Sequence, residues 1–234
     1  MNSNYWKQFY NERTEDYERL TQYEDYEGNL LPALNEIHPL KGTKIIEFGA
    51  GAGRITIQLL PLIGNVWAFD ISPMMLATAQ RKLMPTGRTN WLVGIGDSRA
   101  MPIPSDCAEV AIEGWSLVQI ATWHIERWRR EVEKAVDEMI RVVRPGGVVV
   151  AIETLGTGKM EPAPVEKHKA VHDYLARERG FSSTWIRTDY CFPTLRKMQK
   201  VMEPIFGKAT LETAEESEKG VILPECTGIW WHTV

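Results

Sequence analysis

The sequence predicts an α/β fold in which a mostly parallel, doubly wound β-sheet carries helices on both faces. Short apolar segments of strand length alternate with longer amphipathic segments of helical period along most of the chain. Such alternation forms parallel β-α units with right-handed crossovers. A turn with three glycines, from Gly49 to Gly53, follows the first buried strand, at the place where folds of this class bind ligands.

We expect a single domain over residues 1–234, because 234 residues suit one α/β domain and no linker, repeat or low-complexity tract interrupts the pattern. Within it we distinguish an N-terminal helical cap (1–40), a core that holds the glycine turn (41–155) and a C-terminal part (156–234).

The composition excludes several classes of protein. The formal net charge is −4 and no block of Lys or Arg stands out, so nucleic acid is not an expected partner. Cys107, Cys191 and Cys226 are far apart and lack CxxC spacing, which argues against a disulfide framework or a zinc site. No apolar run is long enough to span a bilayer. These features together indicate a cytoplasmic protein.

The N-terminal segment is rich in aromatic residues. Trp6, Phe9 and Tyr10 have i, i+3, i+4 spacing, so they share one face of an expected helix. This helix either packs onto the domain or closes over a site as a flap whose aromatic rings touch a ligand. A further helix is expected at Glu27–Ile37, ended by His38-Pro39.

The core segment predicts five strands joined by helices. The strands are expected at Ile45–Phe48, Asn65–Asp70, Trp91–Gly94, Cys107–Glu113 and Val148–Thr154. Helices are expected at Ile55–Leu62, from Pro73 to Leu83 behind a Ser72 cap, and at Glu126–Val143. A tight turn at Arg144–Gly147 precedes the fifth strand.

The C-terminal part gives weaker signals. We expect a helix at Ala163–Arg179, a strand at Ser183–Cys191, a helix at Thr194–Phe206 and a last strand at Thr227–Thr233. The sheet then has seven strands. The acidic stretch Glu212–Glu218 is expected to be an exposed loop.

The glycine turn differs from the dinucleotide-binding fingerprint. Its spacing is Gly-x-Gly-x-Gly, and Arg54 stands where the fingerprint has its third glycine. Glu47 lies two residues ahead of Gly49, where a carboxylate would repel a diphosphate but suit cationic groups. The turn therefore favours a cofactor that carries positive charge.

Four motifs occur in the order found in one enzyme family. They are the glycine turn within Ile45–Gly53, Asp70 at the end of the second strand, Gly96-Asp97-Ser98 followed by Met101–Asp106, and Val142–Gly147 before the fifth strand. This pattern resembles the class I S-adenosylmethionine-dependent methyltransferases, in particular their small-molecule branch of the quinone-biosynthesis, type 11-like kind.

The resemblance covers Ile45–Thr154 and implies a Rossmann-like fold with an N-terminal helical cap. It also implies that the core binds S-adenosylmethionine, that the product is S-adenosylhomocysteine, and that the C-terminal part lies on the substrate side. The protein is then expected to be an enzyme, an S-adenosylmethionine-dependent methyltransferase that transfers the methyl group by in-line displacement.

The resemblance also implies roles for residues around the cofactor. Glu47 is expected near the cationic methionine end, and the Glu113 carbonyl is expected to accept from the cofactor ammonium. The backbone that passes beneath the cofactor is that of Gly49, Ala50, Gly51 and Gly53.

At the nucleoside end the resemblance implies four contacts. Asp70 is expected to accept hydrogen bonds from the ribose hydroxyls, and Ile71 to pack against adenine. Asp97 is expected to accept from the adenine amino group, with the Ser98 N–H near a ring nitrogen.

The acceptor is expected to be a small molecule, of an aromatic, polyketide or lipid-like kind. The segment after the fourth strand, Glu113 to Leu117, lacks the Asn/Asp-Pro-Pro-Tyr/Phe signature of amino methyltransferases that act on nucleic acids. His124 is the candidate general base. His168 and His172 have i, i+4 spacing, but with no third ligand nearby we expect no metal site.

Two other functions stay open from the sequence. The first is a catalytically silent S-adenosylmethionine-binding or regulatory protein of the same fold, because a fold does not by itself ensure chemistry. The second is an NAD-dependent dehydrogenase, which the glycine spacing disfavours.

Overall fold

The computed structural model describes residues 14–234. The aromatic triplet Trp6, Phe9 and Tyr10, and with it the choice between cap and flap, lies outside the described residues. No helix among residues 14–234 is long and apolar enough to cross a membrane.

A seven-stranded sheet forms the centre of the fold, in the order β3-β2-β1-β4-β5-β10-β6. Neighbours from β3 to β5 pair in parallel, and β10 pairs antiparallel with both β5 and β6. The mostly parallel, doubly wound sheet predicted from the sequence is confirmed. The strands are β1 Lys44–Phe48, β2 Asn65–Asp70, β3 Trp91–Ile95, β4 Ala108–Gly114, β5 Val143–Thr157, β6 Ser182–Arg187 and β10 Glu225–Thr233.

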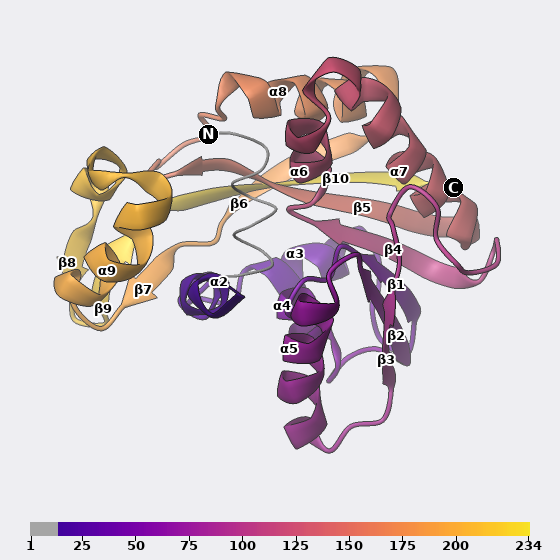
Figure 1. The fold of residues 1–234 in the computed structure, drawn as a ribbon, viewed down its shortest axis with the longest axis horizontal. Helices are drawn as coiled ribbons and strands as arrows, with labels where there is room; N and C mark the ends of the chain where they lie inside the picture. Colours follow the sequence, from indigo (N-terminus) through magenta and orange to yellow (C-terminus); the bar gives the residue numbers. More distant parts are fainter. Residues whose placement is uncertain (1–13) are drawn as a thin grey trace.

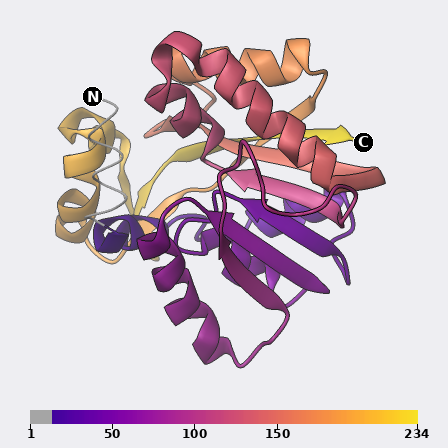
Figure 2. The same cartoon turned by 45° about the vertical axis from the view of Figure 1, so that its right-hand side comes forward.

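Helices cover both faces of this sheet, as Figures 1 and 2 show. One face carries α3, α4 and α5, and the other carries α6, α7 and α8. Each group of helices buries its apolar side chains against the sheet, which gives two separate hydrophobic cores. The helices are α3 Leu30–Ile37, α4 Arg54–Leu59, α5 Pro73–Leu83, α6 Leu117–Trp123, α7 Trp128–Val142 and α8 Glu166–Asp173, with single turns at Met84–Thr86, Ile125–Arg127 and Tyr174–Glu178.

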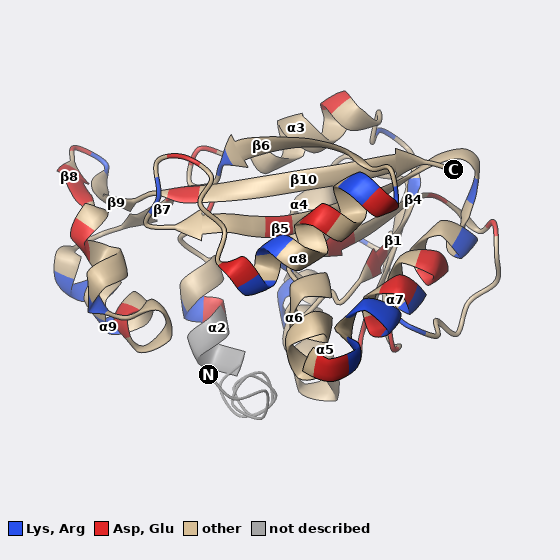
Figure 3. Cartoon of the chain, turned by 90° about the horizontal axis from the view of Figure 1, so that it is seen from above, with Lys and Arg blue, Asp and Glu red and all other residues tan. Residues whose placement is uncertain are grey.

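The sequence signals explain where two of these helices lie. The Ser72 hydroxyl accepts a hydrogen bond from the Met75 N–H at 3.4 Å, and Pro73 opens α5, as predicted. The buried stripe of α7 runs through Val132, Val136 and Met139. Lys, Arg, Asp and Glu occupy many of the other positions of α7, drawn in blue and red in Figure 3.

A second, three-stranded sheet stands at one end of the molecule (Figure 1). It packs against α9 and α2 through a third hydrophobic cluster that includes Leu20, Phe192 and Met202. We call the sheet and α9 the small-sheet unit. Its elements are β7 Tyr190–Phe192, α9 Leu195–Phe206, a 3-10 turn at Lys208–Thr213, β8 Glu215–Ser217 and β9 Gly220–Leu223, and α2 is Thr14–Thr21.

The predicted single strand at Ser183–Cys191 is wrong, because it divides into β6 and β7, which belong to different sheets. Polar contacts fix the corner between them. The Thr188 and Thr227 hydroxyls lie 2.6 Å apart in a buried hydrogen bond. Asp189 pairs with Arg187 at 2.7 Å and accepts from the Glu225 N–H at 2.9 Å. Both contacts with β10 join residues far apart in the sequence.

Three smaller differences from the predicted elements concern a loop, a turn and the end of a helix. The predicted loop at Glu212–Glu218 contains the short edge strand β8, whose side chains are exposed as expected. The turn at Arg144–Gly147 interrupts β5 as an irregularity, since Ala108 pairs with Val143 whereas Val110 pairs with Val148. The helix predicted at Ile55–Leu62 is shorter, because α4 ends at Leu59.

The helix α6 was not predicted, and its N-terminus explains why. The Glu113 carboxylate accepts from the backbone N–H groups of Ser116 and Leu117, and the Glu153 carboxylate accepts from that of Val118 at 2.9 Å. Carboxylates at this position satisfy the free N–H groups of a helix start and its positive dipole end. One of these two caps comes from β5 and is not visible in the local sequence.

Candidate active site

A cavity of about 370 Å³ lies beyond the carboxyl ends of β1, β2 and β4. This is the crevice in which doubly wound folds bind ligands, at the point where the strand order reverses between β1 and β4. The residues that line it include Gly49, Gly51, Asp70, Ile71, Ser72, Gly96, Asp97, Ser98, Arg99, Trp115, Ser116, Gln119, Trp123 and His124. We call it the first cavity.

The glycine turn forms the floor of the first cavity. Gly49 has φ +62°, and a Cβ added there would lie 2.6 Å from the Ser116 Oγ. Gly53 has φ +77° and precedes α4 as its N-cap. Side chains rarely adopt such backbone angles, and at Gly49 there is no room for one. Gly49 and Gly51 both line the first cavity, so the turn presents its backbone there.

The carboxylate of Asp70 holds this turn in place. It accepts from the Gly51 N–H at 2.8 Å and from the Ser72 N–H at 2.8 Å, so it ties the glycine turn to the start of α5. Burial raises the pKa of Asp70, while the N–H groups of Ser72, Gly51 and Ile71 act in the opposite direction. Each carboxylate oxygen keeps a further lone pair for a ligand hydroxyl.

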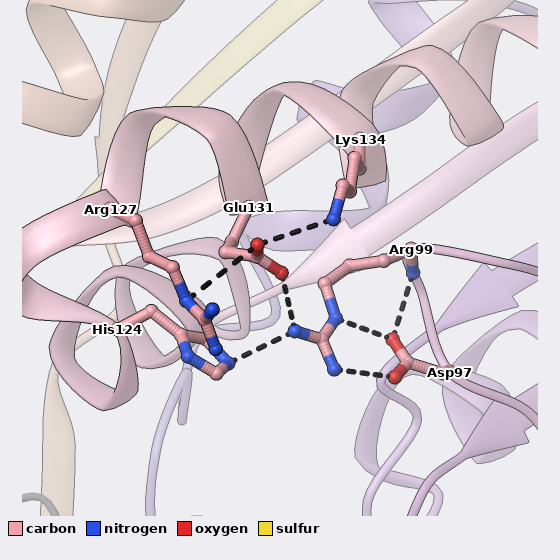
Figure 4. Close-up of polar contacts among 6 residues, drawn as sticks. All are labelled: Asp97, Arg99, His124, Arg127, Glu131 and Lys134. Atoms are coloured by element: carbon pink, nitrogen blue, oxygen red, sulfur yellow. Dashed lines mark hydrogen bonds and ion pairs between the residues drawn. The ribbon is translucent and has the colours of Figure 1, made fainter.

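A charged network closes the other side of the first cavity (Figure 4). Arg99 pairs with Asp97 through its Nη2 at 2.6 Å and with Glu131 of α7 through its Nη1 at 2.6 Å. The hydrogen bonds from Arg99 hold the pKa of Asp97 below its usual range. Lys134 and Arg127 also approach Glu131, at 3.2 and 3.9 Å. The loop after β3 is thereby fastened to α7.

His124 belongs to the same network. Its Nε2 lies 3.0 Å from the Arg99 Nη1 (Figure 4). Because a guanidinium only donates hydrogen bonds, the Nε2 accepts here and carries no proton. His124 lines the first cavity, but this ring nitrogen is engaged with Arg99.

The predicted cofactor residues divide into two groups. Those that line the first cavity are Gly49, Gly51, Asp70, Ile71, Asp97 and Ser98. Glu47, Ala50, Gly53 and Glu113 lie behind this lining. The Thr56 hydroxyl donates to the buried Glu47 carboxyl at 2.5 Å, and burial raises the pKa of Glu47 to about 8.

A second cavity, of about 550 Å³, adjoins the first and shares Trp115 and Gln119 with it. Trp115 has φ +58°, an uncommon backbone angle for a bulky residue. The Arg54 guanidinium stacks on its indole ring at 3.5 Å from the ring centroid. Trp115 thus lies where the two cavities meet, with Arg54 packed on it from the side of the second cavity.

Sequence reasoning missed several residues of the second cavity, chiefly Glu24 and Glu225. They come from the turn after α2 and from the start of β10, so only the tertiary fold brings them together. Arg54 was noticed for a different reason, as the residue in place of a third glycine. Its position at the start of α4 was the one available signal.

The two spaced histidines have different surroundings. His168 lines the second cavity, whereas His172 is buried and stacks on Trp230 at 4.6 Å between ring centroids. Burial lowers the pKa of each to about 4. Among the side chains that the structure describes, no three of His, Cys, Asp or Glu are grouped as metal ligands.

Residues 45–147 match the family model described as "Methyltransferase domain". The match falls on the core of the fold, from β1 to the turn within β5. The chain is 26% identical over 125 residues to a demethylmenaquinone methyltransferase of Desulfitobacterium hafniense, a match that covers 52% of this chain and 46% of that protein. It is also 26% identical over 144 residues to a malonyl-[acyl-carrier protein] O-methyltransferase of Pectobacterium atrosepticum, covering 62% and 50% of the two chains.

The chain spans about half the length of these curated relatives. A crystal structure described as a SAM-dependent methyltransferase from Aquifex aeolicus is similar to this chain with a TM-score of 0.58, at 17% identity and with full coverage of both chains. At that identity the similarity shows the Rossmann-like fold. The segment that matches the family model, residues 45–147, lies within the Ile45–Thr154 range in which the sequence motifs occur.

We expect the change Gly49→Ala to lower the free energy of unfolding by about 1–3 kcal/mol, because it adds strain at positive φ and a clash with Ser116. Gly146→Ala is the matched control, since Gly146 has φ +82° with nothing within 4 Å of an added Cβ. Urea denaturation measures both. Equal losses in the two variants would contradict a close-contact role for Gly49.

We also expect stability to fall between pH 5 and pH 8. Burial raises the pKa of Glu47 to about 8, that of Glu225 to about 8 and that of Glu113 to about 7, so these groups bind protons in the folded state that the unfolded state releases. Their contribution is complete below the unfolded pKa near 4.5 and is lost as pH rises toward the folded pKa. Each group contributes a slope of up to about 1.4 kcal/mol per pH unit.

Urea denaturation at several pH values tests this expectation. The variant Glu47→Gln removes one titrating group and is expected to flatten the profile, whereas Glu216→Gln on the exposed edge strand β8 is expected to leave it unchanged. A wild-type profile that rises from pH 5 to pH 8 would show that these carboxyls do not control stability.

Proposed function

We propose that the protein transfers a methyl group from S-adenosylmethionine to a small-molecule acceptor. The observation that carries the proposal is the first cavity, where the open glycine turn, Asp70 and Asp97 meet within a methyltransferase domain. The residues suit this cofactor. At Gly49 there is no room for a Cβ. The carboxylates of Asp70 and Asp97 line the cavity, and carboxylates favour ligand hydroxyl and amino groups over phosphates.

In this proposal the nucleoside lies between Asp70 and Asp97. Asp70 accepts from the ribose hydroxyls, and Asp97 accepts from the adenine amino group with the Ser98 N–H near a ring nitrogen. Ile71 supports this placement of the nucleoside. Its apolar side chain lines the cavity and is 54% exposed, so it has surface that adenine would bury.

The methionine end in this proposal lies over the glycine turn. Glu47 acts from beneath the turn, since its buried carboxyl is held by Thr56 and a positive charge above it favours ionisation. The carbonyl of Glu113 receives the ammonium. The Glu113 carboxylate already accepts from N–H groups at the start of α6, so in this proposal its backbone carbonyl is the group that meets the ligand.

The cofactor, when bound, supplies a methyl group already activated by the sulfonium, which transfers to the acceptor by in-line displacement. The protein's task is to position the acceptor and exclude water. The second cavity adjoins the first along Trp115 and Gln119, so we assign the acceptor to it.

His124 fits a positioning role better than that of a general base. Its Nε2 accepts from Arg99, which in turn holds Asp97. In this arrangement His124 helps to fix the loop that recognises adenine. A base is required only where the acceptor has to lose a proton.

The nature of the acceptor, aromatic or lipid-like, is part of the proposal, as is a cytoplasmic location. The two relatives are named for different acceptors, a demethylmenaquinone and a malonyl-carrier protein. Their similarity to this chain covers only about half of it in the first case, so it supports the transfer and leaves the acceptor open.

Calorimetry with S-adenosylhomocysteine and with NAD tests the cofactor, and turnover tests the chemistry. We expect S-adenosylhomocysteine to bind and NAD to fail, because Arg54 occupies the place of the third glycine. Release of S-adenosylhomocysteine is then followed against a panel of phenols, quinols and amines. Cofactor binding without turnover on any acceptor would favour the silent binding protein instead.

We expect the change Asp70→Asn to weaken S-adenosylhomocysteine binding by about 10- to 100-fold, because an amide replaces an acceptor for hydroxyl donors and for two N–H groups. Calorimetry measures the affinity, and Glu216→Gln is the control. Unchanged affinity would remove Asp70 from the ribose site.

We expect His124→Ala and Arg99→Ala to weaken binding of the same ligand, by roughly 2- to 10-fold for His124 and more for Arg99, which makes the direct contacts with Asp97. If His124→Ala binds the ligand as the wild type does and abolishes turnover, His124 is a base and the positioning role is wrong.

A further inference from the structure

The second cavity has one buried polar end. Glu24, Arg54, Tyr190 and Glu225 meet there, from four different segments of the chain. Apolar side chains, including Phe206, line other parts of the same cavity. The polar end lies in a place where buried charges are costly unless they are paired.

Arg54 and Glu24 account for each other's charge. The Arg54 Nη2 lies 2.5 Å from the Glu24 Oε1, and their side chains are only 11% and 3% exposed. The guanidinium also stacks on Trp115. The Arg54 guanidinium at this end of the cavity therefore already pairs with Glu24 and stacks on Trp115.

Among the described residues no salt bridge is formed by Glu225. Its side chain is buried, its Oε1 accepts from the Thr154 hydroxyl at 2.5 Å, and its Oε2 is buried without a hydrogen-bond partner among the described residues. The backbone is fixed on both sides, because the Glu225 N–H donates to Asp189 and its carbonyl accepts from the Thr188 N–H. A rigid backbone thus holds an unsatisfied carboxyl oxygen at the cavity.

The charges around Glu225 indicate what is missing. Burial and the neighbouring Glu24 raise the pKa of Glu225 to about 8, while Arg54 and the hydroxyls of Thr154 and Thr157 oppose that rise. Tyr190, the remaining titratable neighbour, is buried, and its own pKa is raised by burial. Two carboxyls thus face one guanidinium, and a second positive charge would balance them.

The opening of the cavity has the opposite character. Lys159 and Lys167 line it with exposed side chains. A ligand with an amino group at one end and a neutral or anionic group at the other would match both ends of the cavity.

We propose that Glu225 binds the protonated amino group of a small-molecule ligand, with its Oε2 accepting an N–H hydrogen bond at the buried end of the second cavity. That this ligand is the methyl acceptor rests on the proposed function. The amino-group site itself rests only on the cavity and its unsatisfied carboxyl.

Matched pairs of amines and alcohols test the site. We expect phenethylamine to bind the full-length protein at least tenfold more tightly than 2-phenylethanol, or hexylamine than 1-hexanol, as measured by calorimetry with and without S-adenosylhomocysteine. In the variant Glu225→Gln the two members of a pair should bind equally. The control Glu216→Gln should keep the preference for the amine.

A measurement on the wild type avoids any loss of folding in the variant. The preference for the amine should increase several-fold from pH 6 to pH 8.5, because ionisation of Glu225 strengthens its bond to an ammonium. Circular dichroism and an unchanged affinity for S-adenosylhomocysteine would verify that Glu225→Gln is folded.

The outcomes separate this proposal from the proposed function. Equal binding of amine and alcohol in every pair, a preference for the alcohol, or a preference that survives Glu225→Gln would each overturn the amino-group site. Failure to bind S-adenosylhomocysteine, with the amine preference intact, would instead overturn methyl transfer and leave the amino-group site standing.

Discussion

The stacking of Arg54 on Trp115 is the contact on which the arrangement of the two cavities depends. Arg54 begins α4 directly after the glycine turn, and Trp115 follows β4 with an uncommon positive φ. The pair joins the two segments that flank the switch point of the sheet, and Glu24 holds the guanidinium from the other side. The same residue that departs from the dinucleotide fingerprint thus holds Trp115, which lines both the first and the second cavity.

Much of the cofactor half was predictable because its signals are local. The glycine spacing, Asp70 at the end of β2 and Ser72 at the start of α5 each lie within short stretches of sequence, and the Asp70 carboxylate links them through backbone N–H groups. The strand bounds of β2 agree with the prediction residue for residue. Burial of parallel strands on both faces makes such segments continuous apolar runs, which are readable without the fold.

The remainder was hidden because it depends on contacts between distant residues. The helix α6 starts where Glu153, from a different strand, caps it, and the corner between β6 and β7 is fixed by contacts with β10. Glu225 looks like an ordinary acidic residue in the sequence. Only the pairing of β10 with β5, together with Tyr190 of β7 in the same cavity lining, makes it a buried carboxyl at the second cavity.

The small-sheet unit contributes Tyr190, Ile205 and Phe206 to the second cavity, and none of its residues lines the first. The small-sheet unit therefore serves only the acceptor side of the proposed reaction, whereas Trp115 and Gln119 of the core line both cavities. A change of shape in this unit would alter part of the second cavity and leave the lining of the first cavity in place. The small-sheet unit is therefore the part of the chain in which substitutions reach the second cavity without touching the lining of the first.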